Sequence, residues 1–142
     1  MEIFEEAVLA YISAAPGRFV KPQYDLKYKD GVGGSCPDFV VIDYMKKTIY
    51  VVEVTTSSDA STINSRILES ETRWFIPLKR EMSELNESFI EWNYRVTLFV
   101  RKSLVSKIKN DSMSDVFVKS FGEIIFPWEW NWKEKQAINP LE

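Results

Sequence analysis

The chain has 142 residues, of which 45% are hydrophobic and 14% aromatic, and its formal net charge at pH 7 is −3. A chain of this size can bury a hydrophobic core as a single domain, which we expect to cover residues 1–142. The sequence contains no histidine, and this excludes His-dependent catalytic triads and zinc-protease motifs. Its single cysteine, Cys36, excludes an internal disulfide and argues against a structural zinc site.

The apolar runs are short. The longest, such as 39–42 and 49–52, fall far below the roughly 20 residues that a membrane-spanning helix needs, and no stretch resembles a signal peptide. We therefore expect a soluble protein with no membrane partner, in the cytoplasm or, if the source is viral, in the host-cell cytoplasm. The acidic balance argues against a protein that coats nucleic acid nonspecifically, because such proteins are basic. It does not exclude a nuclease whose metal site is built from carboxylates.

The predicted elements follow from periodicity and from helix and turn signals. In the first half of the chain we expect a helix over 2–14, a half-exposed strand over 23–29, and interior strands over 38–43 and 48–55. A long helix over 60–86 follows, which Pro77 kinks or divides. The rest of the chain is expected to form a strand over 94–101, short helices over 104–109 and 115–121, and an aromatic tail over 126–132. This order predicts an α/β or α+β sandwich with helices packed on a sheet. The order alone carries no functional information.

Each of the two interior strands carries one acidic residue that is a candidate for the functional site. Asp38 opens the first of these strands after Pro37, and Glu53 lies near the end of the second, within the apolar run Val51-Val52-Glu53-Val54. A hairpin between the strands brings both carboxylates to the same end of the sheet. An ionised carboxylate in an apolar strand is unfavourable unless it is paired or binds a cation. Without histidine and with a single cysteine, any metal here should be a hard, oxygen-ligated ion, which favours Mg²⁺ or Mn²⁺.

Pro37-Asp38 and Glu53-Val54-Thr55 resemble the motif of the PD-(D/E)XK nuclease superfamily, whose restriction-endonuclease-like core is helix, three strands, helix, strand. The resemblance covers roughly residues 2–101, although only a few positions carry it. It implies an endonuclease that hydrolyses phosphodiester bonds with Mg²⁺ or Mn²⁺. The segments Gly-x-x-Pro-Asp-Phe and Glu-x-Thr look similar to nucleases of viruses and mobile elements, so a viral or mobile-element source is implied as well.

The same resemblance implies further site residues. An additional acid from the first helix commonly completes the metal site in this superfamily, and Glu5 matches best by its spacing, with Glu6 next. Asp38, Glu53, Glu5 and Glu6 are thus the candidate metal ligands. The lysine of the motif is replaced by Thr55, which is a candidate catalytic residue by position.

Some superfamily members carry the missing cation on the following helix. Arg66 is the candidate here, with Arg73 as a less suitable substitute, and Asn64 and Ser65 are neighbours that could add polar contacts. Arginine stays protonated, so it can stabilise charge on a phosphate but cannot act as a base.

Several alternatives remain open. A chain that has lost the motif lysine is also compatible with an inactive nuclease fold that binds nucleic acid or a protein, or with a structural protein of a mobile element. DNA is preferred over RNA as a substrate by the resemblance alone, and small cores of this kind often act as homodimers or within larger assemblies. The tryptophans of the tail suit stacking on bases, although packing on the domain or a dimer contact is the commoner role.

Overall fold

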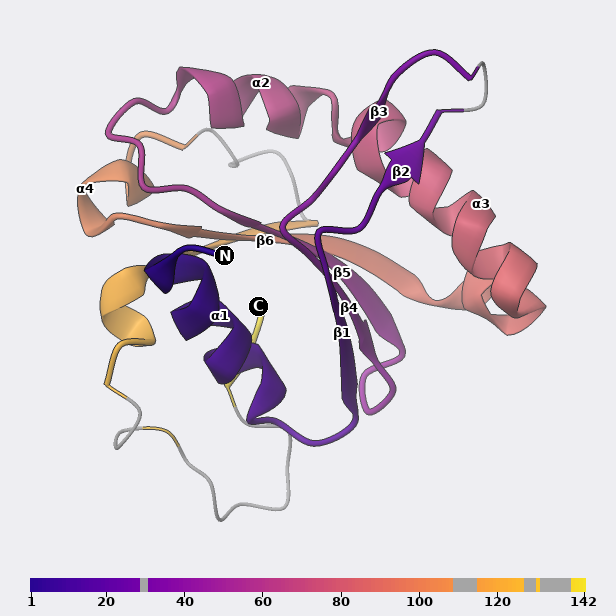
Figure 1. Ribbon diagram of the computed structural model, residues 1–142, viewed down its shortest axis with the longest axis horizontal. Helices are drawn as coiled ribbons and strands as arrows, with labels where there is room; N and C mark the ends of the chain where they lie inside the picture. The colour runs from indigo at the N-terminus through magenta and orange to yellow at the C-terminus, as the bar shows by residue number, and fades with distance from the viewer. Residues whose placement is uncertain (29–30, 109–114, 127–129, 131–138) are drawn as a thin grey trace.

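The computed structural model describes residues 1–28, 31–108, 115–126, 130 and 139–142 (Figure 1). The strands are β1 (Arg18–Pro22), β2 (Leu26–Lys27), β3 (Gly34–Ser35), β4 (Phe39–Asp43), β5 (Thr48–Val54), β6 (Asn93–Val100) and β7 (Val116–Ser120). The α-helices are α1 (Ile3–Ser13), α2 (Ser61–Leu68), α3 (Ile76–Leu85) and α4 (Lys102–Val105). A π-helix, η1 (Glu71–Phe75), and two 3₁₀ helices, η2 (Glu87–Glu91) and η3 (Phe121–Glu123), complete the described elements.

Five strands form one mixed sheet in the order β1-β4-β5-β6-β7. The first three pair antiparallel, whereas β6 is parallel to β5 and β7 is parallel to β6. A parallel step needs a crossover connection, and α2, η1 and α3 supply it between β5 and β6. Figure 1 shows α1 against one face of the sheet and α2 with α3 on the other. The predicted mixed α/β class is confirmed.

Strand β5 explains how the sheet buries both of its faces. Ile49 and Val51 pack in the apolar cluster on the α3 side, whereas Tyr50 and Val52 pack in the cluster on the α1 side. All four side chains are fully buried. This accounts for a continuous apolar run in place of the alternation seen in half-exposed strands. Glu53 continues the pattern of positions 49 and 51 and therefore falls on the α3 side.

The first strand differs from the prediction. β1 covers Arg18–Pro22 and pairs with β4, whereas within the described part of the predicted 23–29 strand, residues 23–28, only Leu26–Lys27 is paired as a strand. Gln23 has a φ of +50°, which breaks the extended backbone directly after Pro22. The apolar residues of β1 are adjacent in sequence, and the strand lies at the edge of the sheet, so it lacks the period-two pattern that predicts a strand.

Among the described residues, β2 and β3 pair only with each other, and residues 26–28 and 31–35 are named the arm below. Gly34 is required in it, because a Cβ atom at that position would lie 2.3 Å from the carbonyl oxygen of Leu26. The Ser35 hydroxyl donates a hydrogen bond of 3.0 Å to the carbonyl oxygen of Arg73 in η1. This bond fixes the arm beside α3, where Figure 1 shows it standing away from the main sheet.

The predicted helix over 60–86 is divided before Pro77 and not at it. α2 ends at Leu68, the π-helix η1 follows, and α3 begins at Ile76. Pro77 stands in the first turn of α3, a position that tolerates proline, and it has no N–H to donate to the carbonyl four residues earlier. The carbonyl of Arg73, four residues before the proline, accepts from Ser35 instead. Pro77 thereby leaves free the acceptor that anchors the arm.

The predicted helix over 115–121 was wrong. Val116–Ser120 forms β7, and only Phe121–Glu123 is helical, as a 3₁₀ turn. The alternating β-branched residues Val116 and Val118 favour a strand, and pairing with the buried β6 decides the outcome. In place of the predicted helix over 104–109 there is a short helix, α4, at Lys102–Val105, which begins two residues earlier. Residue 109 lies outside the described residues.

Of the predicted aromatic tail over 126–132, the structure describes Phe126 and Trp130, and the remaining positions lie outside the described residues. The Trp130 ring packs edge-to-face on Tyr11 of α1, with 5.4 Å between ring centroids. For this one tryptophan the packing interpretation holds. Helices within the described ranges are all too short or too polar to cross a bilayer.

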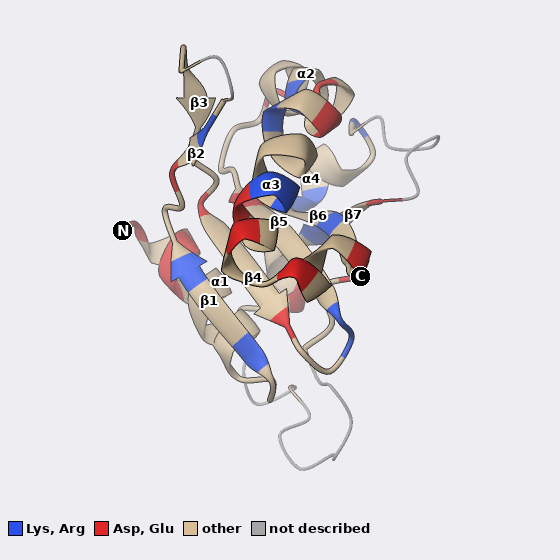
Figure 2. Ribbon diagram, turned by 90° about the vertical axis from the view of Figure 1, so that its right-hand side faces the viewer, with Lys and Arg blue, Asp and Glu red and all other residues tan. Residues whose placement is uncertain are grey.

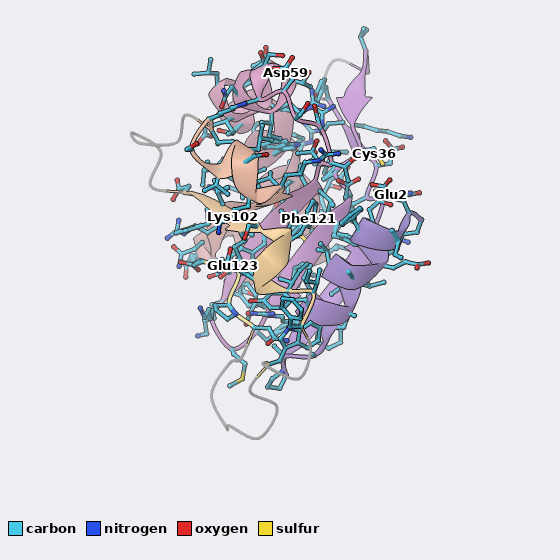
Figure 3. The ribbon with its side chains drawn as sticks, turned by 90° about the vertical axis from the view of Figure 1, so that its left-hand side faces the viewer. Glu2, Cys36, Asp59, Lys102, Phe121 and Glu123 are labelled. Carbon is cyan, nitrogen blue, oxygen red and sulfur yellow. The ribbon has the colours of Figure 1, made fainter. Side chains whose placement is uncertain are left out.

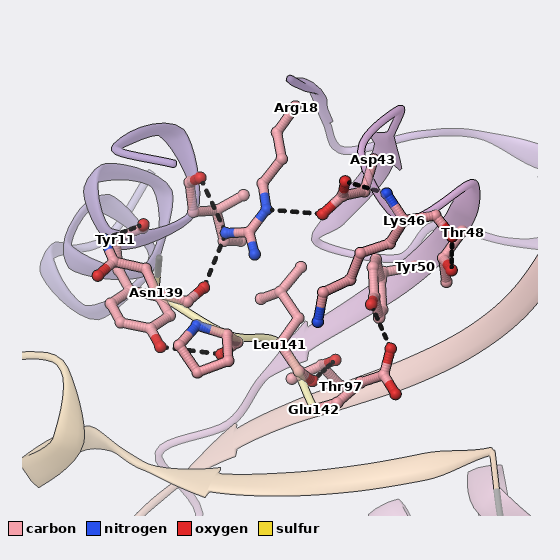
Figure 4. A network of polar contacts seen from close by, with 12 residues as sticks. Tyr11, Arg18, Asp43, Lys46, Thr48, Tyr50, Thr97, Asn139, Leu141 and Glu142 are labelled. Carbon is pink, nitrogen blue, oxygen red and sulfur yellow. Dashed lines mark hydrogen bonds and ion pairs between the residues drawn. The ribbon is translucent and has the colours of Figure 1, made fainter. Parts of the chain in front are cut away.

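Residues 139–142 lie between α1 and the sheet in a network of polar contacts (Figure 4). The Tyr11 hydroxyl donates to the carbonyl of Pro140 at 2.8 Å, and the Thr97 hydroxyl donates to that of Leu141 at 2.6 Å. Arg18 donates through Nη1 to the carbonyl of Asn139 at 2.8 Å. These bonds satisfy buried polar groups on the α1 side of the sheet, away from the acids described next.

Candidate functional site

Asp38 and Glu53 meet at one end of the β4–β5 hairpin. The register pairs Phe39 with Val52, so the next rung sets Asp38 opposite Glu53. Asp38 Oδ2 accepts a hydrogen bond of 2.7 Å from the backbone N–H of Val54, which holds its carboxyl group over the end of β5. The structure thus brings together the two acids that the sequence selected.

The environment of Glu53 favours its protonated form. The residue is 6% exposed, and its pKa is raised from 4.5 to about 8, first by burial and next by the negative charge of Asp38, against the lowering effect of Arg66. A side-chain hydrogen bond with Asp38 raises it further, and the charge of Arg73 lowers it. Such a buried acid, held beside a second carboxylate, is typical of sites that bind a cation or transfer a proton.

Asp38 is affected by the same neighbours. Burial raises the pKa of Asp38, and the hydrogen bond from Val54 lowers it. A side-chain hydrogen bond with Glu5 raises it, whereas the one with Glu53 lowers it.

The start of α1 supplies the third acid. Glu5 reaches Asp38, and its Oε2 atom also accepts from the backbone N–H of Glu2 at 3.2 Å, as part of a capping box. Figure 3 shows Glu2 at the same edge of the molecule as Cys36, which stands two residues before Asp38. Glu6 is exposed to solvent. Of the two helix acids proposed from the sequence, the structure places Glu5 at the pair.

Two arginines of the crossover helices act on Glu53 through their charge. Arg66 Nη1 lies 3.7 Å from Glu53 Oε2, and its side chain is 37% exposed. Arg73 is close enough for its charge to act on Glu53. The sequence favoured Arg66 over Arg73, and of the two the ion pair with Glu53 is formed by Arg66. Arg73 acts on the same acid through its charge alone.

Thr55 and Asn64, the other polar candidates, form hydrogen bonds outside the acid pair. The Thr55 hydroxyl accepts from the backbone N–H of Ser57 at 3.2 Å, which stabilises the loop after β5. Asn64 donates from Nδ2 to the carbonyl of Lys107 at 3.1 Å. These bonds join the α2 region to its neighbouring loops and occupy groups that were proposed for the site.

The donor set agrees with a hard cation. In the described ranges, no three acidic, histidine or cysteine side chains are grouped so that they could hold a metal ion. Mg²⁺, however, is commonly bound by one or two carboxylates, with water and substrate phosphate completing its coordination. Asp38 and Glu53 offer such a pair, and Glu5 adjoins it. Burial is the main cause of their raised pKa values, and the negative charge of a neighbouring carboxylate raises both further. A divalent cation would offset that negative charge.

The chain was compared with protein-family models, curated proteins and solved structures. None matches. The function must therefore be inferred from the geometry of the site.

The raised pKa of Glu53 predicts how the stability of the protein depends on pH. Because the folded protein keeps this proton up to pH of about 8, whereas the unfolded chain releases it near 4.5, the folded state binds more protons between these values. The free energy of unfolding, measured with urea in chelator, should fall as pH rises from 4.5 to 8. Mn²⁺ at pH 8 should raise it again, since a bound cation stabilises the folded state. A rise in stability across that window would contradict the assigned environment of Glu53.

Proposed function

We propose that this protein is a divalent-metal-dependent nuclease that hydrolyses phosphodiester bonds. The observation that carries the proposal is the buried Glu53, which shares a hydrogen bond with Asp38 while Arg66 lies 3.7 Å away. A carboxylate pair beside a guanidinium group combines cation ligands with a group that can receive phosphate charge.

The element order supports the same proposal. With the arm set aside, the chain runs α1, then β1, β4 and β5, then the crossover helices, then β6. The same order is expected of a restriction-endonuclease-like core, in which Pro37-Asp38 and Glu53-Val54-Thr55 would be the motif segments. The element order and the acid pair both support the proposed activity.

The roles follow from chemistry. Asp38 and Glu53 would hold the cation, with Glu5 assisting through Asp38. When bound, Mg²⁺ or Mn²⁺ supplies positive charge that neutralises the phosphate and acidifies water. In the overall reaction the water oxygen bonds to phosphorus, one P–O ester bond breaks, and a proton passes to the leaving oxygen. Arg66 stabilises the charge that develops on the phosphate, in place of the lysine that Thr55 replaces.

One observation favours a second function. The ion pair between Arg66 and Glu53 partly neutralises the acid without a metal. A nuclease fold that has lost its lysine and closed its site with this pair would bind nucleic acid or a protein partner without cutting. Metal-dependent cleavage separates the two functions.

The test is a cleavage assay with single-stranded DNA, duplex DNA and RNA, each in Mn²⁺, Mg²⁺ or chelator. We expect cleavage only with metal, and with DNA preferred. Asp38→Asn should lower it about 100-fold, the scale on which removal of one electrostatic group affects an active site. Glu84→Gln, at an exposed position of α3, is the matched control and should cleave normally. Absence of metal-dependent cleavage on all three substrates would leave the binding function in its place.

A further inference from the structure

A hollow of about 410 Å³ lies between the arm and the beginning of α3. Its walls include Tyr28 of the arm, Thr72 and Arg73 of η1, and Ile76, Pro77 and Arg80 of α3. The volume falls in the range of about 300–1,000 Å³ that is typical of small-molecule sites. The hollow is therefore large enough for one unit of a polymer, and it combines apolar walls with two guanidinium groups.

Arg73 connects this hollow to the acid pair. It lines the hollow and also lies close enough to Glu53 for its charge to act on that carboxyl group. Its Nε atom is buried and has no hydrogen-bond partner among the described residues. The guanidinium is held in position by the Trp74 ring, 5.8 Å from the ring centroid.

The charges at the hollow suit one phosphate group. Arg73 and Arg80 contribute two positive charges, and Glu69 on the wall contributes one negative charge. Arg80 uses one of its five N–H donors to bind the carbonyl of Lys27 at 2.5 Å, which also ties α3 to the arm. Figure 2 shows basic segments on α2, on α3 and in the arm, at the same end of the molecule.

Tyr28 gives the hollow an aromatic wall. Its side chain is half-buried, and no aromatic ring of the described residues stacks on it. Ile76 and Pro77 add apolar surface to the same hollow. An aromatic ring beside paired cations is the combination by which proteins hold unpaired bases and their phosphates. A base within a continuous duplex is unsuitable, because its neighbours in the stack already cover both of its faces.

We propose that the hollow binds one unpaired nucleotide next to the phosphate that is cut, with its base against Tyr28 and its phosphate at Arg73 and Arg80. The substrate is then a single strand or the splayed strand of a fork, and not continuous duplex. This assignment rests on the proposed nuclease function for its place in the reaction, but binding can be tested without cleavage.

The test is fluorescence anisotropy of the full chain in chelator, with a labelled oligothymidylate, a blunt duplex and a fork with single-stranded arms. Oligothymidylate and fork should bind at least about tenfold more tightly than the duplex. Tyr28→Ala should weaken binding of both about tenfold, within the range for loss of one base stack, whereas Tyr28→Phe should bind normally. Arg80→Ala should weaken binding and lower the slope of log affinity against log salt by about 0.7.

Two residues of the β4–β5 turn, at the opposite end of the hairpin, are the controls. Tyr44→Ala removes an exposed ring and Lys46→Ala an exposed cation, and neither should change the affinity. Tyr28→Leu keeps an apolar side chain of similar size in the arm but removes the aromatic ring. If this variant binds more weakly and its melting temperature is unchanged, the lost affinity is due to stacking on the ring.

The outcomes distinguish the two proposals. Selective binding that depends on Tyr28 and Arg80, without cleavage in metal, supports the hollow and overturns the nuclease function. Cleavage that needs Asp38 but is unchanged in Tyr28→Ala and Arg80→Ala supports the nuclease and overturns the hollow. Equal affinity for the duplex and the single strand also overturns the proposal that the hollow binds an unpaired nucleotide.

Discussion

Glu53→Gln should lower metal-dependent cleavage at least about 100-fold while leaving the protein folded. Burial and the Asp38 charge raise the pKa of Glu53 to about 8, so the folded chain already accommodates a neutral group at this position. Glutamine has nearly the same shape and can donate to Asp38 as the protonated acid does. It cannot become negative, however, and so it cannot hold a divalent cation as a carboxylate does. Single-turnover rates in saturating Mn²⁺ at pH 8 measure the effect.

The same variant separates catalysis from stability. In chelator at pH 8, Glu53→Gln should unfold at a higher urea concentration than the wild type, because it removes an acid whose ionisation opposes folding there. The pH dependence of unfolding assigned to Glu53 should also be lost. A variant that is both more stable and inactive identifies a group retained for chemistry. A variant that cleaves at the wild-type rate would remove Glu53 from the reaction.

The acid pair and the interior hairpin could be predicted from the sequence, for local reasons. The apolar runs of β4 and β5 are unbroken, and a short turn between them fixes the register, so the positions of Asp38 and Glu53 follow directly. Helix α1 could be predicted as well, because strong helix formers end at Pro16-Gly17. In each case the signal lies within a few neighbouring residues.

The arm and β1 could not be predicted in this way. Their pairing depends on contacts between distant residues, such as the bond from Ser35 to the Arg73 carbonyl that Pro77 leaves free. Nothing in the sequence near Tyr28 indicates a hollow shared with Arg80. β7 shows the same limit, since Val116 and Val118 form a strand because β6 offers them a partner.

Distance along the chain explains why Arg73 was ranked below Arg66. Judged by distance from Glu53 along the chain, Arg66 is the nearer cation. Arg73 lies in the π-helix η1, beyond the end of α2, where its charge still acts on Glu53 and its side chain also lines the hollow. Chain distance does not predict this, because it depends on where α2 ends and η1 begins.

Asp43→Ala should lower the free energy of unfolding by about 3–5 kcal/mol, the cost of leaving one charge of a buried pair without its partner. Arg18 Nε lies 3.1 Å from Asp43 Oδ2, and both side chains are completely buried. Asp43 Oδ1 also accepts from the backbone N–H of Lys46 at 3.0 Å, which fixes the turn between β4 and β5. Urea denaturation at pH 7 measures the loss.

The exposed pair between Arg95 and Asp115 is the matched comparison, with side chains 26% and 43% exposed. Asp115→Ala removes the same chemical group where water replaces it, so the loss should stay below about 1 kcal/mol. Replacing both buried partners, with Arg18→Met and Asp43→Leu, should recover part of the stability, because an apolar pair leaves no uncompensated charge. Equal losses for Asp43→Ala and Asp115→Ala would show that burial adds nothing to the first pair. We expect the larger loss of unfolding free energy for Asp43→Ala, together with normal cleavage by the folded fraction of that variant. This result would show that the Arg18–Asp43 pair stabilises the fold and does not take part in the reaction, which we assign to Asp38 and Glu53 on the other face of the sheet.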